Sequence, residues 1–219
     1  MIPLRDTIRS RTFPVVTVAL IAANILIFLH EASLSEAELQ MLARTYGVVP
    51  ARDLPALIYH PLSLGTYIPF LTAMFLHGGW FHVLGNMLYL WVFGDNVEDA
   101  MGRGRFLLFY LLAGFAGSLA HVLANPGTTV PTIGASGAVA GVLGAYFVSF
   151  PRSRVLSLVP IFFFITLVEL PAVLFLFLWF AMQLLNGVAS LAIPGQTVAW
   201  WAHIGGFLSG ALLVKFFRR

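Results

Sequence analysis

Long apolar segments alternate with short polar ones along the chain, and each apolar segment is bounded by charged residues, glycine or proline. A helix needs roughly 20 residues to cross the hydrocarbon core of a bilayer, so apolar runs near that length are typical of transmembrane helices. The pattern predicts an all-α membrane protein, a six-helix bundle that forms a single domain over residues 1–219. The predicted spans cover about 13–30, 81–97, 106–124, 136–150, 170–188 and 198–217.

A seventh apolar run, Val155 to Val168, is harder to assign. It is short, Pro160 interrupts it, and Glu169 and Pro171 close it. These features favour an interfacial or re-entrant segment over a full crossing. The sequence alone leaves open whether this run is re-entrant, interfacial or a further span, and six spans are preferred.

The composition places the protein in lipid. Its mean hydropathy is +0.91, and 59% of its residues are hydrophobic while 10% are charged, against roughly a quarter charged in soluble domains. The pI of about 9.6 does not indicate a nucleic-acid partner, because the basic residues form small clusters between apolar runs rather than one patch. The absence of cysteine excludes disulfides, a cysteine nucleophile and thiolate metal sites.

The basic residues also predict an orientation, because short cytoplasmic loops are enriched in Lys and Arg. With the N-terminus inside, most of the twelve basic residues fall in inside segments, and a seventh crossing would place the 215–219 tail outside. We therefore expect an integral protein of a prokaryotic plasma membrane with both termini in the cytoplasm. The inside residues are Arg5, Arg9, Arg11, Arg103, Arg105, Arg152, Arg154, Lys215, Arg218 and Arg219.

The first outer loop, about 31–80, is long for a helical bundle. Glu31, Glu36 and Glu38 predict a helix near its start, and an apolar stretch with Pro61 and Pro69 follows. Loops of this length are usually functional or disordered. We expect a partly helical segment in the membrane interface, and its conformation is left open.

Polar residues open three of the predicted spans. His82 and Asn86 lie four residues apart, hence on one helical face of span two, while Ser136 and His203 stand near the starts of spans four and six. These three spans run from outside to inside, so their openings lie at one depth near the outer face. Together they predict a serine nucleophile, a histidine base and two further hydrogen-bonding groups. Taken singly, each is more often a packing or interfacial residue.

Small residues recur on spans four and six. Ala202, Gly206 and Gly210 are spaced every four residues, and span four has glycines that predict a matching smooth side. Close approach of the two spans would bring Ser136 within reach of His203. Because Ser136 starts a helix, free backbone N–H groups there could stabilise an oxyanion. The glycines on span four are Gly137, Gly141 and Gly144, and Gly134, just before the span, is a further candidate packing residue.

Other hydrolytic chemistries lack their motifs. No HExxH sequence is present, which argues against a zinc metalloprotease helix, and we expect no metal and no cofactor. Ala138 stands where G-x-S-x-G requires its second glycine. Asp95 and Asp99 lie together at the cytoplasmic end of span two, so they are not a paired-aspartate centre.

Three motifs in order resemble those of the rhomboid family of intramembrane serine proteases: HxxxN at 82–86, GASG at 134–137 and AHIGG at 202–206. The likeness extends through FLHGGWFH at 75–82 and FGDNVEDAMGRGRF at 93–106. The resemblance implies a Ser–His dyad of Ser136 and His203, with His82, Asn86 and the Ser136 backbone stabilising the oxyanion. It implies single-pass transmembrane proteins as substrates, cut near the outer interface, where the active site opens.

Two departures from the family pattern stand out. Some rhomboids have an aromatic residue four positions after the serine to support the histidine ring, and Ala140 stands here. A Trp-Arg pair of the first loop is also absent. Two other functions remain open: a pseudoprotease that binds membrane proteins without cutting them, and a small transporter, although no internal repeat of the kind transporters show is present.

Overall fold

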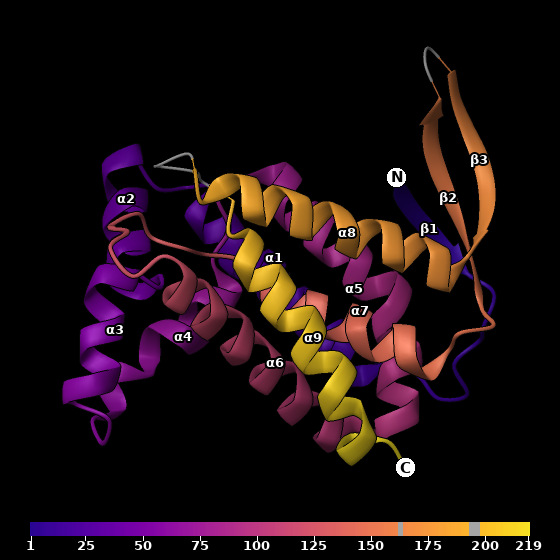
Figure 1. Ribbon diagram of the computed structural model, residues 1–219, viewed down its shortest axis with the longest axis horizontal. Coiled ribbons are helices and arrows are strands. Elements are labelled where there is room, and N and C mark those ends of the chain that lie inside the picture. Colours follow the sequence, from indigo (N-terminus) through magenta and orange to yellow (C-terminus); the bar gives the residue numbers. More distant parts are fainter. Residues whose placement is uncertain (162–163, 193–197) are drawn as a thin grey trace.

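The computed structural model describes residues 1–161, 164–192 and 198–219, and most of the chain is helical (Figure 1). Each segment predicted as a span is a helix, with bounds that differ from the prediction by a few residues. By length and hydropathy alone, α6 and α8 are the described helices that qualify as membrane spans. The helices are α1 (Val15–Glu31), α5 (Trp80–Met101), α6 (Arg103–Ala124), α7 (Ser136–Ser149), α8 (Ala172–Ser190) and α9 (Trp200–Phe217).

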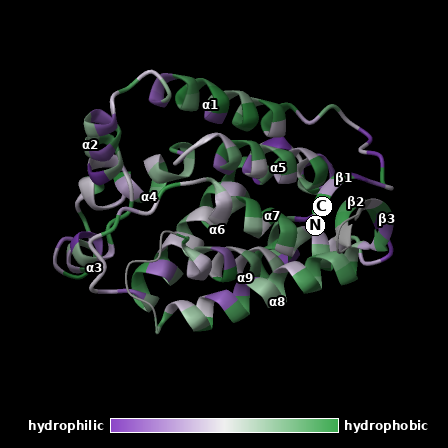
Figure 2. Ribbon diagram, turned by 90° about the horizontal axis from the view of Figure 1, so that it is seen from above, coloured by the Kyte–Doolittle hydropathy of each residue, from purple (hydrophilic) through white to green (hydrophobic). Residues whose placement is uncertain are grey.

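Helix α7 is the core of the bundle. Every residue from Gly137 to Tyr146 is buried, and helices α5, α6, α8 and α9 pack around it. Viewed from above, α1 and α8 form opposite sides of the bundle and are mostly hydrophobic (Figure 2). Large apolar side chains such as Leu185 of α8, 73% exposed, point outward. An apolar outer surface of this extent suits lipid rather than water.

Helices α7 and α9 touch through their backbones. A Cβ atom added at Gly206 would lie 2.0 Å from the carbonyl oxygen of Gly137, and one added at Gly210 would lie 2.0 Å from that of Gly141. Real Cβ atoms do not approach an oxygen so closely, so both positions of α9 require glycine. The same interface brings the carbonyl of Ala202 within 3.5 Å of a Cβ built on Gly137.

A buried carboxylate joins α1 to α5. Glu98, 2% exposed, accepts hydrogen bonds from the backbone N–H groups of Val16 and Thr17, at 3.0 and 2.7 Å, and from the Thr17 hydroxyl at 2.8 Å. The first N–H groups of a helix have no partner within it and carry partial positive charge. Glu98 therefore caps α1 from a neighbouring helix.

The segment between α1 and α5 is largely helical, as expected for its first part. Helix α2 begins with a capping box between Ser35 and Glu38. Glu31 is an exception to the expectation, because it ends α1 instead of lying in α2. The elements are α2 (Glu36–Tyr46), α3 (Pro50–Tyr59), η1 (Leu64–Thr66), α4 (Ile68–Thr72) and η2 (Ala73–Phe75).

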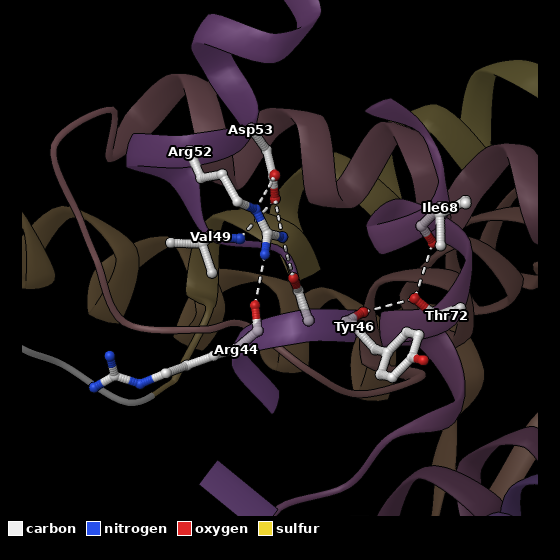
Figure 3. Close-up of polar contacts among 8 residues, drawn as sticks. Arg44, Tyr46, Val49, Arg52, Asp53, Ile68 and Thr72 are labelled. Carbon is white, nitrogen blue, oxygen red and sulfur yellow. Dashed lines mark hydrogen bonds and ion pairs between the residues drawn. The ribbon is translucent and has the colours of Figure 1, made fainter. Parts of the chain in front are cut away.

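Polar contacts fix these short helices to one another (Figure 3). Arg52 of α3 forms an ion pair of 2.6 Å with Asp53 and donates a hydrogen bond of 2.7 Å to the carbonyl of Gly47, just after α2. The hydroxyl of Thr72 in α4 donates to the carbonyl of Tyr46 at 2.6 Å. The chain ends of α2, α3 and α4 are thus connected into one unit.

A three-stranded antiparallel sheet lies at the other end of the molecule, where both termini also lie (Figure 1). This sheet departs from the all-α expectation. The run 155–168, interpreted as interfacial or re-entrant, forms two strands, apart from residues 162–163, which lie outside the described residues. The strands are β1 (Ile2–Asp6), β2 (Arg154–Ile161) and β3 (Phe164–Pro171).

Two features of the sequence explain why the run 155–168 forms strands. The run is rich in β-branched residues, which favour strands. Strand β1, from the far N-terminus, pairs with β2 from Ile2 opposite Leu158 to Asp6 opposite Val155. Pro160 lies beyond this pairing, so its missing N–H group removes no bond to β1.

Asp6 connects the sheet to the bundle. Its carboxylate accepts hydrogen bonds from the side-chain amide of Asn96 in α5, at 2.9 Å, and from the hydroxyl of Tyr146 in α7. Burial raises the pKa of the Asp6 carboxyl from its ordinary value of 3.8 to about 6, with a smaller contribution from the nearby charge of Asp95.

Replacing Gly210 by alanine tests the contact between α7 and α9. The new methyl group would collide with the Gly141 carbonyl, and overpacking of this kind costs about 1–3 kcal/mol or more. We expect a clearly lower midpoint of thermal unfolding in detergent. Gly104→Ala on α6, where an added Cβ meets nothing within 4 Å, is the control and should leave the midpoint nearly unchanged. Equal effects of the two substitutions would contradict the packing.

Asp6 predicts a pH dependence of stability. Between pH 3.8 and about 6 the folded protein holds a proton at Asp6 that the unfolded chain has lost, so this contribution to the free energy of unfolding falls as the pH rises and levels off above the window. Asp6→Asn cannot titrate and should lose this component. Unfolding midpoints of both proteins between pH 4 and 7 give the difference, and parallel curves would show that Asp6 contributes nothing.

Candidate active site

One cavity collects the polar residues that open α5, α7 and α9. Its volume is about 790 Å³, within the range of small-molecule and peptide side-chain pockets. Most of its wall is apolar. The polar residues among its lining are His82, Asn86, Thr132, Ser136, Gln183 and His203.

Ser136 is the first residue of α7, and the loop before it is held by the segment between α1 and α5. The N–H of Gly134 donates to the carbonyl of Ala73 at 2.8 Å, and Thr132 exchanges two backbone hydrogen bonds with Val48. Gly134 has a φ of +128°, which glycine adopts without strain. The position of the serine is thus set by contacts from a segment more than 50 residues earlier.

His82 lies against this loop. A Cβ built on Gly134 would lie 2.6 Å from Nε2 of His82 and 3.7 Å from Oγ of Ser136, so the imidazole and the hydroxyl are neighbours. Nδ1 of His82 accepts a hydrogen bond from the N–H of Gly78 at 3.3 Å. In a neutral ring the proton is therefore on Nε2, the atom beside Gly134. Glycine at 134 is required by its φ and by this close approach.

Asn86 follows one turn after His82 and is 8% exposed. Its amide nitrogen is buried and has no hydrogen-bond partner in the part of the chain that the structure describes. A buried donor without a partner is costly and rare. Asn86 is also one of the residues that line the cavity.

His203 lies in the first turn of α9 and is supported from α8. Its Nδ1 is 2.8 Å from Oε1 of Gln183. The indole of Trp179 lies at 6.1 Å from the imidazole centroid with a tilt of 34°, and that of Trp200 at 6.0 Å, edge-on. The His203 ring is thus supported by side chains of α8 and by Trp200, whereas position 140 of α7 is an alanine.

The structure therefore brings His82, Asn86, Ser136 and His203 to one cavity, while no hydrogen bond joins the Ser136 hydroxyl to His203 within the described ranges. Such bonds are often long before substrate binds. Sequence reasoning missed Gln183. A signal existed, because Gln183 is a polar residue inside an apolar run and such residues need a partner.

These groups can act together on a carbonyl carbon. A serine hydroxyl supplies a nucleophile, a neutral imidazole can accept its proton, and the start of α7 with the His82 and Asn86 side chains offers donors to an oxyanion. The wall around these groups is mostly apolar. The arrangement fits acyl transfer, including peptide hydrolysis.

Comparison with known proteins gives a family match and several relatives. The family model of the rhomboid domain matches residues 64–219. The chain is 45% identical to rhomboid protease GluP of Bacillus subtilis over 84 residues, 38% of this chain and 16% of the relative. It is 38% identical to RHOMBOID-like protein 1 of Arabidopsis thaliana over 142 residues, 65% of this chain and 32% of the relative.

A third relative is the mitochondrial rhomboid protein 1 of Saccharomyces cerevisiae, 30% identical over 149 residues, 66% of this chain and 40% of the relative. The chain thus spans less than half of the length of each of these relatives. The relatives come from a bacterium, a plant and a fungal mitochondrion, so the family does not fix one type of membrane.

Proposed function

Because the chain belongs to the rhomboid family, we propose that it is an intramembrane serine endopeptidase, which cuts transmembrane helices of single-pass membrane proteins near the outer interface. The observation that carries this proposal is the cavity shared by Ser136, His203, His82 and Asn86. Family membership supports this class of reaction, and these residues could supply each group that peptide hydrolysis needs.

The proposed topology is a single domain of six transmembrane helices, α1 and α5 to α9, with the sheet and both termini on the cytoplasmic side. Two observations support it. Helices α5, α7 and α9 all begin at the cavity, which agrees with three parallel spans. Hydrophilic residues gather over α2 and α3 at one end and near the sheet at the other (Figure 2). The protein is an integral membrane protein whose compartment is not fixed.

In the proposed mechanism, the Ser136 hydroxyl attacks the carbonyl carbon of the scissile bond while Nε2 of His203 takes its proton. The oxyanion of the tetrahedral intermediate accepts hydrogen bonds from the Ser136 backbone N–H, from Nε2 of His82 and from the Asn86 amide. His203 then donates its proton to the leaving amine. Water, activated by the same imidazole, releases the acyl group from Ser136.

The substrate must unwind before this reaction, because the carbonyl of a residue within a helix is already hydrogen-bonded. Residues of low helix propensity, such as glycine and proline, lower the cost of unwinding. The preferred substrate is therefore a transmembrane helix with such residues near its outer end.

Ser136→Ala and His203→Ala test the dyad. Each should abolish cleavage of a reporter protein with one transmembrane helix in proteoliposomes, because nucleophile and base act in the same step. Unfolding curves in detergent check that both variants fold. A fluorophosphonate should label the wild-type protein covalently and leave Ser136→Ala unlabelled. Cleavage by folded Ser136→Ala would contradict the mechanism, and an unlabelled, inactive wild type would favour a pseudoprotease or a transporter.

His82→Ala and Asn86→Ala test the oxyanion donors. Loss of one donor to an oxyanion typically lowers kcat by roughly 10²–10³ and leaves KM little changed. We expect this pattern for both variants with the same reporter. Ser149→Ala, at the opposite end of α7 from Ser136 and outside this cavity, is the comparison in which one hydroxyl is lost, and it should leave kcat and KM near the wild-type values. A change in KM with normal kcat would instead assign His82 and Asn86 to substrate binding.

A further inference from the structure

The imidazole of His203 has a defined partner on the side opposite to the proposed proton transfer. Its Nδ1 lies 2.8 Å from Oε1 of Gln183, on α8. A base that must accept a proton at Nε2 needs its other nitrogen to carry the hydrogen. The Gln183 amide must therefore present its oxygen to Nδ1, so that it accepts a hydrogen bond from His203.

A second hydrogen bond within α8 supplies that orientation. The amide nitrogen of Gln183 donates to the carbonyl oxygen of Trp179, one turn earlier, at 3.2 Å. The amide oxygen is therefore the atom that faces the imidazole, and an oxygen of an amide accepts but cannot donate. Nδ1 of His203 must carry the hydrogen, which leaves the lone pair on Nε2.

The burial of Gln183 adds to this argument. Gln183 is only 4% exposed and lies in a helix that is mostly apolar. A buried amide is unfavourable unless its groups are paired, and both groups of Gln183 are. Trp179, on the same face of α8, also lies beside the imidazole. Helix α8 thus contacts the His203 ring in two ways, through the amide oxygen of Gln183 and through the indole of Trp179.

We propose that Gln183 is a positioning residue of the site, which fixes the tautomer and the orientation of His203 and makes Gln183, His203 and Ser136 a functional triad. The role rests on the proposed protease function. A neutral amide does in this apolar cavity what a carboxylate does in soluble serine hydrolases, without placing a charge in the membrane. It also explains how Ala140, with no ring, can occupy its position on α7.

Two substitutions separate positioning from simple packing. Gln183→Met keeps the length of the side chain and removes the acceptor. We expect kcat for the reporter to fall by about 10- to 100-fold with KM unchanged, because one oriented hydrogen bond to the base is lost. Gln183→Glu keeps the acceptor and adds a charge that stabilises the protonated ring. It should retain activity at alkaline pH and shift the acid limb of the pH–rate profile to higher pH.

Asn186→Leu is the matched control. Asn186 lies on α8 three residues later, and its amide donates a hydrogen bond to the carbonyl of Met182 in its own helix. This variant should keep the wild-type kcat and pH profile. If Gln183→Met behaves like Asn186→Leu, or if the acid limb of Gln183→Glu does not move, the positioning role is wrong. Should Gln183→Met not fold, the pH profile of Gln183→Glu still decides.

A measurement without turnover separates this proposal from the protease function itself. Nitrogen NMR shifts of ¹⁵N-labelled histidine report the tautomer, and the His203 signals are those absent in His203→Ala. Wild type and Ser136→Ala should both show His203 protonated at Nδ1, whereas Gln183→Met should show a mixture. A wild-type protein that shows the expected tautomer but neither cleaves the reporter nor reacts with the fluorophosphonate would refute only the protease function. A mixture of tautomers in the wild-type protein would refute the triad.

Discussion

The contact between the backbones of α7 and α9 is the constraint on which the site depends. Side chains at Gly206 or Gly210 would meet carbonyl oxygens of α7 at 2.0 Å, so the two helices approach as closely as backbone atoms allow. In lipid no hydrophobic effect drives helices together, and close packing of small residues supplies the attraction instead. Ser136 and His203 start these same two helices. The packing that holds the bundle together therefore also sets the separation of Ser136 and His203, the proposed nucleophile and base.

Close packing alone does not orient the reacting groups, and three other parts of the chain contribute. The segment between α1 and α5 holds the loop before Ser136 through Ala73 and Val48. Helix α5 contributes His82 beside Gly134. Helix α8 contributes the acceptor for His203. A rigid pair of helices with separately supported side chains resembles the general design of active sites, in which a second layer of contacts fixes the residues that react.

The sequence predicted the helices and the meeting of His82, Asn86, Ser136 and His203 in one cavity, because both follow from local signals. Apolar runs of helical length marked the six helices, and the direction of successive spans placed the openings with His82, Ser136 and His203 together. The sheet was missed, since its apolar run shows no clear alternation and β1 comes from about 150 residues earlier in the chain. Gln183 was missed for a related reason. A polar residue in an apolar run shows that a partner is needed, but only the packing of α8 on α9 identifies it as His203.

Some of the buried polar groups are fully hydrogen-bonded, and others are not. Glu98 accepts three hydrogen bonds from α1, and Gln183 uses both ends of its amide. Each of them holds another element in place. The Asn86 amide nitrogen has no partner among the described residues and borders the cavity. Folding would favour an apolar side chain at this position, because an unpaired buried donor is destabilising. The proposed mechanism gives this donor an acceptor, the oxyanion of the tetrahedral intermediate, which exists only during the reaction.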